Sequence, residues 1–252
     1  MKKFRKLLFL WCGCICALHA YAEPGLALDV GVSHEALSGG RADWFSRQLR
    51  LNYLKENYEN LYLGGRETER FGLKDQEAHI GGVFALSENL HFQTELGSSA
   101  SHQILPKNYV DLNAHHNLGQ GWGADLGGRM SEYTIGKTAV ARFGVERYLG
   151  DERFSYTLFS GGPEGASNQF SHRLQWAHYF SDFDWMGVSL VRGQESENLG
   201  GRTFSTSQVQ GWVLSGYRHL SESWGLNWDA GTIRQGVLYT RTGAQIGLRY
   251  RF

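Results

Sequence analysis

Short polar turns recur along the chain at nearly constant spacing, and this repeat constrains the fold more than any other feature. Each turn follows an apolar residue, and the second turn residues stand at positions 55, 87, 119, 150, 181 and 221. Successive turns are 31 or 32 residues apart, except for a last interval of 40. Such an interval accommodates two membrane-crossing strands of about 9–11 residues each with their connections. The repeat predicts seven hairpins, or about fourteen strands; twelve strands is the alternative if one short segment is misassigned.

The segments between these turns alternate apolar and polar side chains, as residues 90–96 and 139–146 illustrate. A period of two with one polar face indicates β-strands. Longer, Gly- and Ser-rich connections are expected at the opposite end, at 34–42, 66–76, 98–106, 133–137, 161–167, 195–205 and 234–238. We therefore expect an all-β fold, a transmembrane antiparallel up-and-down β-barrel with short periplasmic turns and longer extracellular loops. A soluble β-sandwich or lipocalin-like barrel is the competing fold.

The N-terminus has the three parts of a secretory signal peptide. Basic residues at positions 2–6 precede an apolar stretch at 7–18, and Ala20 and Ala22 form the small-x-small cleavage pattern. We expect residues 1–22 to be cleaved and residues 23–252 to form the barrel. An uncleaved membrane anchor is the alternative.

Composition excludes several classes of protein. The chain carries 25 basic and 25 acidic residues, and removal of the signal peptide leaves a net charge near −4, so a nucleic-acid partner is not expected. All three cysteines fall within residues 12–16, so the mature chain has no disulfide. No second apolar run is long enough to suggest a membrane-spanning helix of ~20 residues.

Aromatic residues gather near the expected strand ends, as in the interfacial girdles of outer-membrane barrels. They are Trp122, Phe154, Tyr156, Phe180, Trp185, Trp224 and Trp228. The last strand is more specific, because Gln245, Gly247, Tyr250 and Phe252 resemble the C-terminal assembly signal of bacterial outer-membrane barrels. That resemblance implies that the general barrel-assembly machinery reads this strand; an ordinary amphipathic strand is the alternative.

The turn at 119–121 sets the register of its flanking strands. It places Asp111 opposite Arg129 and His115 opposite Asp125, all on the inward, polar face. A slip of one residue would turn these side chains toward lipid. Further inward charges are expected at Glu77, His79, Glu95, Arg142, Glu146, Arg173 and Arg249. The pattern predicts a lumen crossed by ion pairs and obstructed rather than wide; a plainly solvated lumen is the alternative.

No catalytic or metal-binding residues are expected, and no cofactor. Nucleophilic hydrolysis needs Ser and His on one face with a third polar group. Adjacent residues on a strand point to opposite faces, which separates the pairs Ser33–His34, Ser101–His102 and Ser171–His172. His219 and Ser221 have a suitable spacing but lie at a tight turn. His115 and His116 are adjacent and cannot share one metal ion from a strand.

Several spaced stretches carry a family resemblance. They are the region 66–82 with Asp75, Gly97-Ser98, Leu105-Pro106, Gly121-Trp122-Gly123 with Arg129 and Tyr133, Ser171-His172-Arg173, Tyr179-Phe180, Gly193-Gln194-Glu195, Tyr239-Thr240-Arg241 and Gly247-Leu248-Arg249. With them, the chain resembles the YaiO family of outer-membrane β-barrel proteins. The resemblance implies a barrel of poorly defined function, acting near exopolysaccharide or biofilm machinery, and it supplies no catalytic residues.

These observations lead to an expected function and its alternatives. We expect a non-enzymatic, porin-like barrel of the bacterial outer membrane that assists glycan export or surface assembly, or forms a narrow channel. Its expected partners are outer-membrane lipid and lipopolysaccharide, the barrel-assembly machinery and a glycan, which the inward Tyr109, Tyr133 and Tyr148 could contact. A membrane-embedded lipid or lipopolysaccharide hydrolase is the alternative, and a soluble periplasmic binding module is the third hypothesis.

Overall fold

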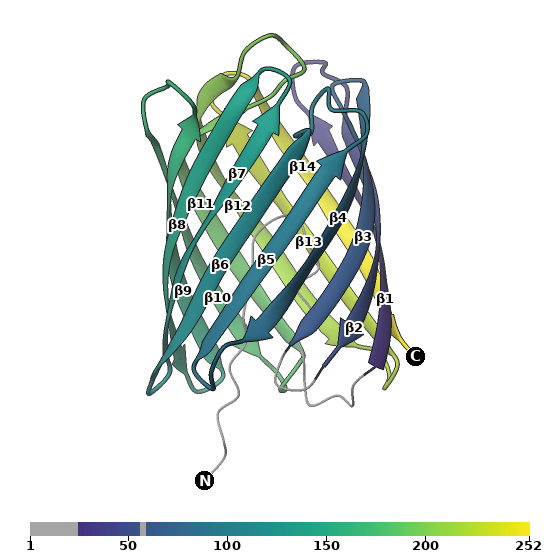
Figure 1. Ribbon diagram of the computed structural model, residues 1–252, viewed down its shortest axis with the longest axis vertical. Coiled ribbons are helices and arrows are strands. Elements are labelled where there is room, and N and C mark those ends of the chain that lie inside the picture. The colour runs from purple at the N-terminus through teal and green to yellow at the C-terminus, as the bar shows by residue number, and fades with distance from the viewer. Residues whose placement is uncertain (1–24, 56–58) are drawn as a thin grey trace.

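Fourteen antiparallel strands form one closed barrel in the computed structural model, which describes residues 25–55 and 59–252 (Figure 1). The strands are β1 (Gly25–Leu37), β2 (Trp44–Leu54), β3 (Asn60–Arg70), β4 (Leu73–Ala85), β5 (Leu90–Ser99), β6 (Asn108–Gly119), β7 (Trp122–Tyr133), β8 (Gly136–Leu149), β9 (Glu152–Pro163), β10 (Gln169–Tyr179), β11 (Trp185–Glu197), β12 (Ser205–His219), β13 (Trp224–Gln235) and β14 (Tyr239–Arg251). The predicted fold class and the count of fourteen strands are confirmed. The expected signal peptide, with Ala20 and Ala22, lies outside the described residues.

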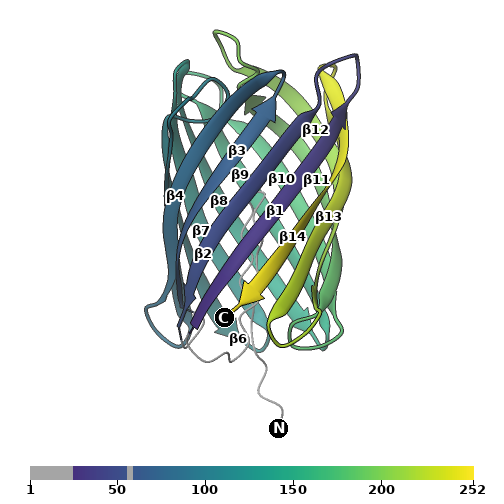
Figure 2. The same cartoon turned by 90° about the vertical axis from the view of Figure 1, so that its right-hand side faces the viewer.

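Each strand pairs with its neighbours in the sequence, and β1 closes the barrel against β14 (Figure 2). Closure leaves no unpaired strand edge, which a sheet in hydrocarbon requires. At this seam Arg249 donates two hydrogen bonds to the fully buried Asp29, at 2.5 and 2.6 Å, and Asn52 donates a third at 2.8 Å. The described residues contain no helix long and apolar enough to cross a membrane.

The connections at one end match the predicted tight turns, for example at 86–89, 120–121 and 150–151. At the other end the loops are shorter than the sequence predicts. The expected 66–76 loop consists of only Phe71 and Gly72, and the loops at 133–137 and 234–238 shrink to 134–135 and 236–238.

The reason for the shortened 66–76 loop is local. Phe71 and Gly72 have φ values of 55° and 77°, which are typical of a two-residue hairpin turn whose twist matches that of its strands. The strands therefore continue as hydrogen-bonded hairpins where sequence reasoning places open loops. The longer connections that remain are 38–43, 100–107, 164–168 and 198–204.

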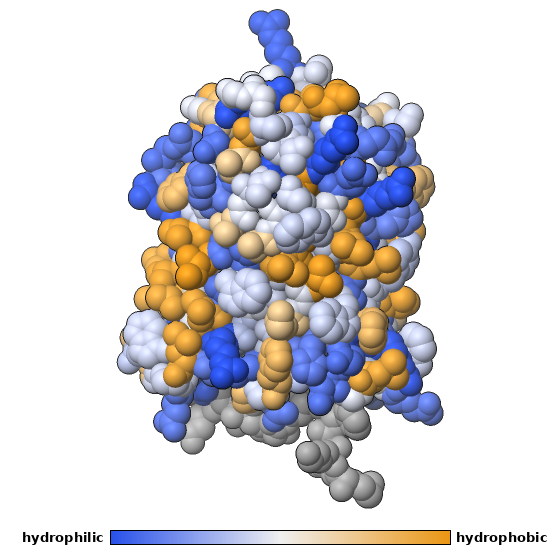
Figure 3. All heavy atoms as spheres, turned by 180° about the vertical axis from the view of Figure 1, so that it is seen from behind, coloured by the Kyte–Doolittle hydropathy of each residue, from blue (hydrophilic) through white to orange (hydrophobic). Residues whose placement is uncertain are grey.

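The barrel exterior carries an apolar band. Exposed hydrophobic side chains include Leu49, Leu63, Ile80, Leu96, Leu126, Phe143, Leu174, Leu190 and Ile246. Seen from the side of β10–β14, hydrophobic residues concentrate around the middle of the barrel, with hydrophilic residues prominent above them (Figure 3). So much apolar surface is unusual for a soluble monomer and fits a lipid-facing wall.

Most of the predicted aromatic residues face outward. Trp122, Phe154, Phe180 and Trp224 are exposed at the end of the barrel that carries the tight turns. Trp185 is an exception: it shares the inward parity of β11 and pairs in register with the buried Tyr217, so its assignment to the lipid-facing girdle is wrong. The position near a strand end is right, but the parity of the strand turns this ring into the lumen.

The last strand divides the four residues of the expected assembly signal between its two faces. Gln245 and Gly247 lie on the lumen side, where a Cβ at Gly247 would meet the Asn227 side chain at 2.7 Å. Tyr250 lies on the outward side and packs against Phe252, with ring centroids 5.0 Å apart. Phe252 is exposed beside the turns.

Candidate functional site

The lumen holds the four charged residues named from the register of β6 and β7. Asp111 is the register partner of Arg129, and His115 is the register partner of Asp125. Arg129 Nη1 lies 3.9 Å from Asp111 Oδ2, and His115 Nδ1 lies 3.1 Å from Asp125 Oδ1. Both pairs are within ion-pair distance inside the barrel.

Asp111 has a closer partner on β8 that sequence reasoning does not identify. Arg142 donates to both carboxylate oxygens of Asp111, at 2.5 and 3.3 Å. Gly127 on β7 is the register partner of Arg142, and its missing side chain leaves the guanidinium free to reach across that strand. An inward Gly opposite a long inward cation is the sequence signal that could have found this pair.

His115 of β6 is likewise linked across β7 to side chains of β8 and β9. His115 Nε2 lies 3.7 Å from Glu146 Oε1, and Arg153 Nε donates to Glu146 Oε2 at 2.8 Å. Gly123 lies beside this cluster, where a Cβ would come within 2.9 Å of the His115 ring. Charges of β6, β7 and β8 therefore form a continuous wall, and Arg153 of β9 borders it.

Glu95 on β5 extends this wall and links Tyr109 on β6 to Tyr62 on β3. Tyr62 and Tyr109 donate to the two carboxylate oxygens of Glu95, at 2.8 and 2.7 Å. The Arg129 guanidinium stacks 3.7 Å from the centre of the Tyr109 ring. Tyr109 is buried in this network, so it belongs to the wall and does not offer a free ring to a glycan. We call the lumen face of β3–β8 the charged wall.

The opposite lumen face is built of small and apolar residues. Along the middle of β11–β13 the inward positions are Gly187, Ser189, Val191, Gly193, Val209, Gly211, Val213, Ser215, Gly231 and Ile233. We call this face the small-residue wall. Asp229 is the inward acidic residue in the middle of these strands. Its register partners are Ser215 on β12 and Gln245 on β14. Because these side chains are short, space in the lumen is expected along this wall.

The loop 100–107 is held at the loop end of the barrel by one carboxylate. Asp75, which is fully buried near the start of β4, accepts hydrogen bonds from the backbone N–H groups of Gln103, Ile104 and Leu105 at 3.1, 2.7 and 2.8 Å. Hydrogen bonds to an ionised acceptor are the strong class. Ile104 and Leu105 are buried as a result.

The loop 198–204 crosses the mouth from the opposite side of the barrel. Asn198 Nδ2 donates to the backbone oxygens of Gln103 and Ile104 at 3.0 and 3.3 Å. Leu199 packs against a cluster centred on Trp44, and the Phe204 ring lies 5.3 Å from that of Tyr133 in an edge-to-face arrangement. Because β4 and β11 lie seven places apart in the ring of fourteen strands, these contacts bridge the mouth.

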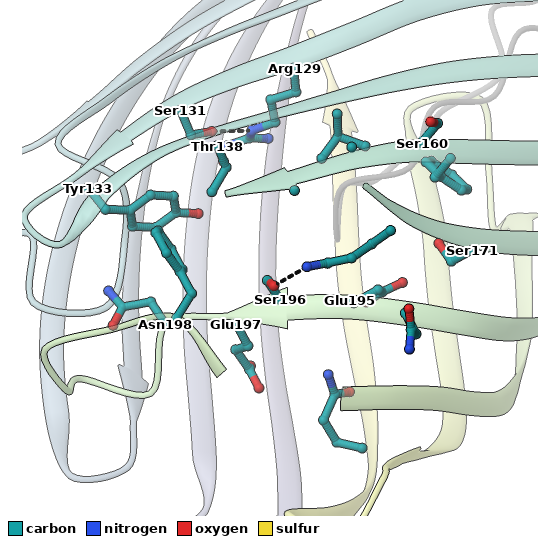
Figure 4. Close-up of a pocket in the computed structure, with 18 of the residues that line it drawn as sticks. Arg129, Ser131, Tyr133, Thr138, Ser160, Ser171, Glu195, Ser196, Glu197 and Asn198 are labelled. Carbon is teal, nitrogen blue, oxygen red and sulfur yellow. Dashed lines mark hydrogen bonds between the residues drawn. The ribbon is translucent and has the colours of Figure 1, made fainter. Parts of the chain in front are cut away.

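A cavity of 370 Å³ lies beneath this bridge, between the charged wall and the loop-side ends of β9–β11 (Figure 4). Its lining combines hydroxyl and amide groups with aromatic rings: Ser131, Thr138, Ser160, Ser171, Ser196, Gln169, Gln235, Asn198, Tyr133, Phe159 and Phe204. Arg129 and Arg142 enter it from the charged wall, and Glu195 and Glu197 come from β11. The arrangement can accommodate a small polar solute and supplies both donors and acceptors of hydrogen bonds.

The Ser and His residues considered for hydrolysis do not assemble around this cavity. Ser171 faces the lumen, whereas His172 is exposed on the outer face. His219 Nδ1 lies 3.4 Å from Asp184 Oδ1. Ser221 Oγ accepts a hydrogen bond from the Trp224 backbone N–H at 3.2 Å, so this hydroxyl stabilises the turn. Within the described residues, no group of three His, Cys, Asp or Glu side chains could hold a metal ion.

The sequence model of a family described as "YaiO membrane beta barrel domain" matches residues 27–198. The chain belongs to this family. The match covers β1–β11, apart from the first two residues of β1, and thus the whole of the charged wall. No curated protein sequence matches this YaiO-family barrel.

Solved outer-membrane barrels share its fold at low sequence identity. A "CymD monoaromatic hydrocarbon channel" has a TM-score of 0.61 and 7% identity, covering 92% of this chain and 89% of that one. A "Bacterial polysaccharide outer membrane secretin" has a TM-score of 0.60 and 8% identity, over 92% and 99%. Omp33 of Acinetobacter baumannii has a TM-score of 0.56 and 9% identity, over 92% and 100%. The YaiO-family chain is thus a β-barrel protein of the bacterial outer membrane.

Proposed function

We propose that this protein is a non-catalytic, narrow outer-membrane channel for small polar solutes. The observation that carries the proposal is the two-sided lumen. Long charged side chains bind one another on β3–β8, a cavity lies beneath the mouth, and the inward side chains deeper on β11–β13 are short. We infer that a solute passes from that cavity along the small-residue wall. The titles of two barrels of the same fold, a hydrocarbon channel and a polysaccharide secretin, agree with a transport role.

A saccharide is the class of solute that the cavity fits best. Sugars present hydroxyl groups that donate and accept hydrogen bonds, and apolar ring faces that pack on aromatic side chains. Ser171, Gln169 and Ser196 offer the first kind of contact, and Phe159 and Phe204 offer the second. A role beside exopolysaccharide export, in biofilm formation, is the narrower form of this proposal.

The proposal is tested by planar-bilayer conductance of the refolded barrel. We expect small, steady steps that maltotriose reduces when it is added on the loop side. Replacing Ser189 with Trp on the small-residue wall should reduce the conductance several-fold, whereas Leu190→Trp, on the adjacent outward position, should leave it unchanged. A folded barrel without steps, or equal steps in both variants, would contradict the proposed path.

A further inference from the structure

Two arginines stand on the lipid-facing surface of the barrel within one row of cross-strand neighbours. His172 pairs with Arg192, Arg192 with Gln210, Gln210 with Arg234, and Arg234 with Thr240, so the row runs over β10–β14. Both arginines are exposed, and they share the outward parity of their strands. We call these five residues the Arg192–Arg234 row.

The row lies at the upper edge of the apolar band. Two residues closer to the turns, the same outward faces carry Leu174, Leu190 and Trp212, all of them exposed. Beyond the row, toward the loops, the outward positions of β12 are the exposed Gln208 and Thr206. Figure 3 shows the same change from hydrophobic to hydrophilic on this side of the barrel.

An outward arginine is tolerated only at certain depths. It costs about 2–4 kcal/mol at the bilayer midplane and about 0–1 kcal/mol near the interfaces. The row therefore belongs at the headgroup level, and it lies on the loop side, which faces the outer leaflet. The headgroups of that leaflet are the phosphorylated glucosamine sugars of lipopolysaccharide.

Among the residues that the structure describes, no carboxylate pairs with either arginine of the row. Within the described residues the Arg192 side chain makes no hydrogen bond or ion pair, and Arg234 donates only to the backbone oxygen of Gly236, at 3.2 Å. Between the row and the loop ends, the outward faces of β10–β14 contain no Asp or Glu. These guanidinium groups are free to bind an external anion.

The exterior of β2–β4 shows the opposite arrangement. There the outward cations Arg47 and Lys74 both contact Glu67. Lys74 Nζ lies 2.9 Å from Glu67 Oε1, and Gln76 donates a hydrogen bond to the same carboxylate at 2.9 Å. The cations of that cluster are therefore already neutralised by Glu67. The difference between the two sectors points to an external ligand at the row.

We propose that the Arg192–Arg234 row binds the phosphorylated sugar headgroup of one lipopolysaccharide molecule. Arg192 and Arg234 lie one strand to either side of Gln210, so each guanidinium can contact a phosphate while the Gln210 amide contacts the sugar between them. Thr240 lies on the far side of Arg234, where its hydroxyl can contact the same phosphate group as Arg234. Guanidinium groups suit this role because they bind phosphate through two parallel hydrogen bonds. The proposal is independent of whether the lumen conducts.

Native mass spectrometry of the purified, folded barrel tests this site, with bisphosphorylated lipid A as the probe. We expect the parent to retain lipid A, and the double variant Arg192→Gln/Arg234→Gln to bind it at least about tenfold more weakly. Arg47→Gln is the matched control, because it removes an outward cation that Glu67 already neutralises, and its binding should equal that of the parent. Heat-modifiable gel mobility confirms that every variant is folded.

Three further probes distinguish the source of the anion. Dephosphorylated lipid A should bind weakly, phosphatidylglycerol should not displace lipid A, and inorganic pyrophosphate should compete only poorly. Equal binding of the parent and the double variant would overturn the proposal. So would phosphatidylglycerol or pyrophosphate binding as tightly as lipid A, because either result would mean a general anion site.

Discussion

The charged wall and the small-residue wall are built from strands of similar length and the same alternation, yet they carry opposite kinds of side chain. On β3–β8 arginines, carboxylates and tyrosines meet across two strands at a time, as Arg142 does with Asp111. On β11–β13 glycine, serine and valine fill the corresponding positions. Alternation decides only that a residue faces the lumen; the size and charge of the residue decide whether that face is rigid or open.

Glycine has a different role on the two sides. On the charged wall a Cβ at Gly97 would overlap the Tyr109 ring, and a Cβ at Gly81 would come within 2.5 Å of the Tyr62 hydroxyl. These glycines are the recesses into which the large side chains of the next strand fit. On the small-residue wall a Cβ at Gly193 or Gly231 would instead come within 2.3 Å of the backbone of the neighbouring strand, so glycine there permits close approach of the two backbones.

Breaking the charged wall should have the largest effect on stability. Asp111→Ala leaves Arg142 and Arg129 without their shared carboxylate, and loss of one partner of a buried ion pair costs about 3–5 kcal/mol. The midpoint of guanidinium unfolding in lipid vesicles should fall accordingly. Ser189→Ala on the other wall is the control and should change the midpoint little. Similar shifts in the two variants would show that the walls do not differ in rigidity.

Filling a recess of the charged wall should have the next largest effect. Gly97→Val pushes the Tyr109 ring away from Glu95, and overpacking of this kind costs about 1–3 kcal/mol. Gly65→Val is the matched control, because its side chain would point outward and meet only the Glu77 backbone oxygen at 3.7 Å. The same unfolding assay measures both, and equal losses would contradict the packing role of Gly97.

Releasing the bridge that joins the two sides should change conductance more than stability. Asp75→Ala removes the acceptor of three backbone N–H groups in the loop 100–107. Keeping one such donor buried without a partner would cost about 1–3 kcal/mol, so these groups turn to water instead. The loop should leave the mouth, and single-channel conductance should rise. Asp75→Asn keeps one oxygen acceptor and should give an intermediate value. Unchanged steps in Asp75→Ala would mean that the bridge does not limit the passage.

The smallest effect is expected on the small-residue wall. Asp229 places one negative charge on the proposed path, and Asp229→Asn should lower the ratio of cation to anion permeability without abolishing conductance. Reversal potentials in a salt gradient measure the change. Glu67→Gln, on the barrel exterior, is the control and should leave the ratio unaltered.

Much of the fold follows from patterns along the chain. The spacing of the turns predicts fourteen strands, and the arithmetic of one turn places Asp111 opposite Arg129 and His115 opposite Asp125, where the structure also has them. These relations are local, because a tight turn fixes the register of the two strands that it joins. The extent of the 66–76 loop and the direction of Trp185 could not be read in this way, since they depend on where each strand ends and on its parity.

The sequence by itself determined the barrel, its strand number, its two faces and the inward direction of the charges named from it, because alternation and turn spacing act between residues that are close along the chain. Only the tertiary structure decided that Arg142 reaches across β7 to Asp111 and that Asp75 and Asn198 hold the two loops across the mouth. It also decided that Arg192 and Arg234 lie in one outward row without a carboxylate partner among the described residues. These relations join strands that no single turn connects. They are fixed by closure of the ring, which brings β4 to face β11 across the lumen and lets side chains meet over a glycine.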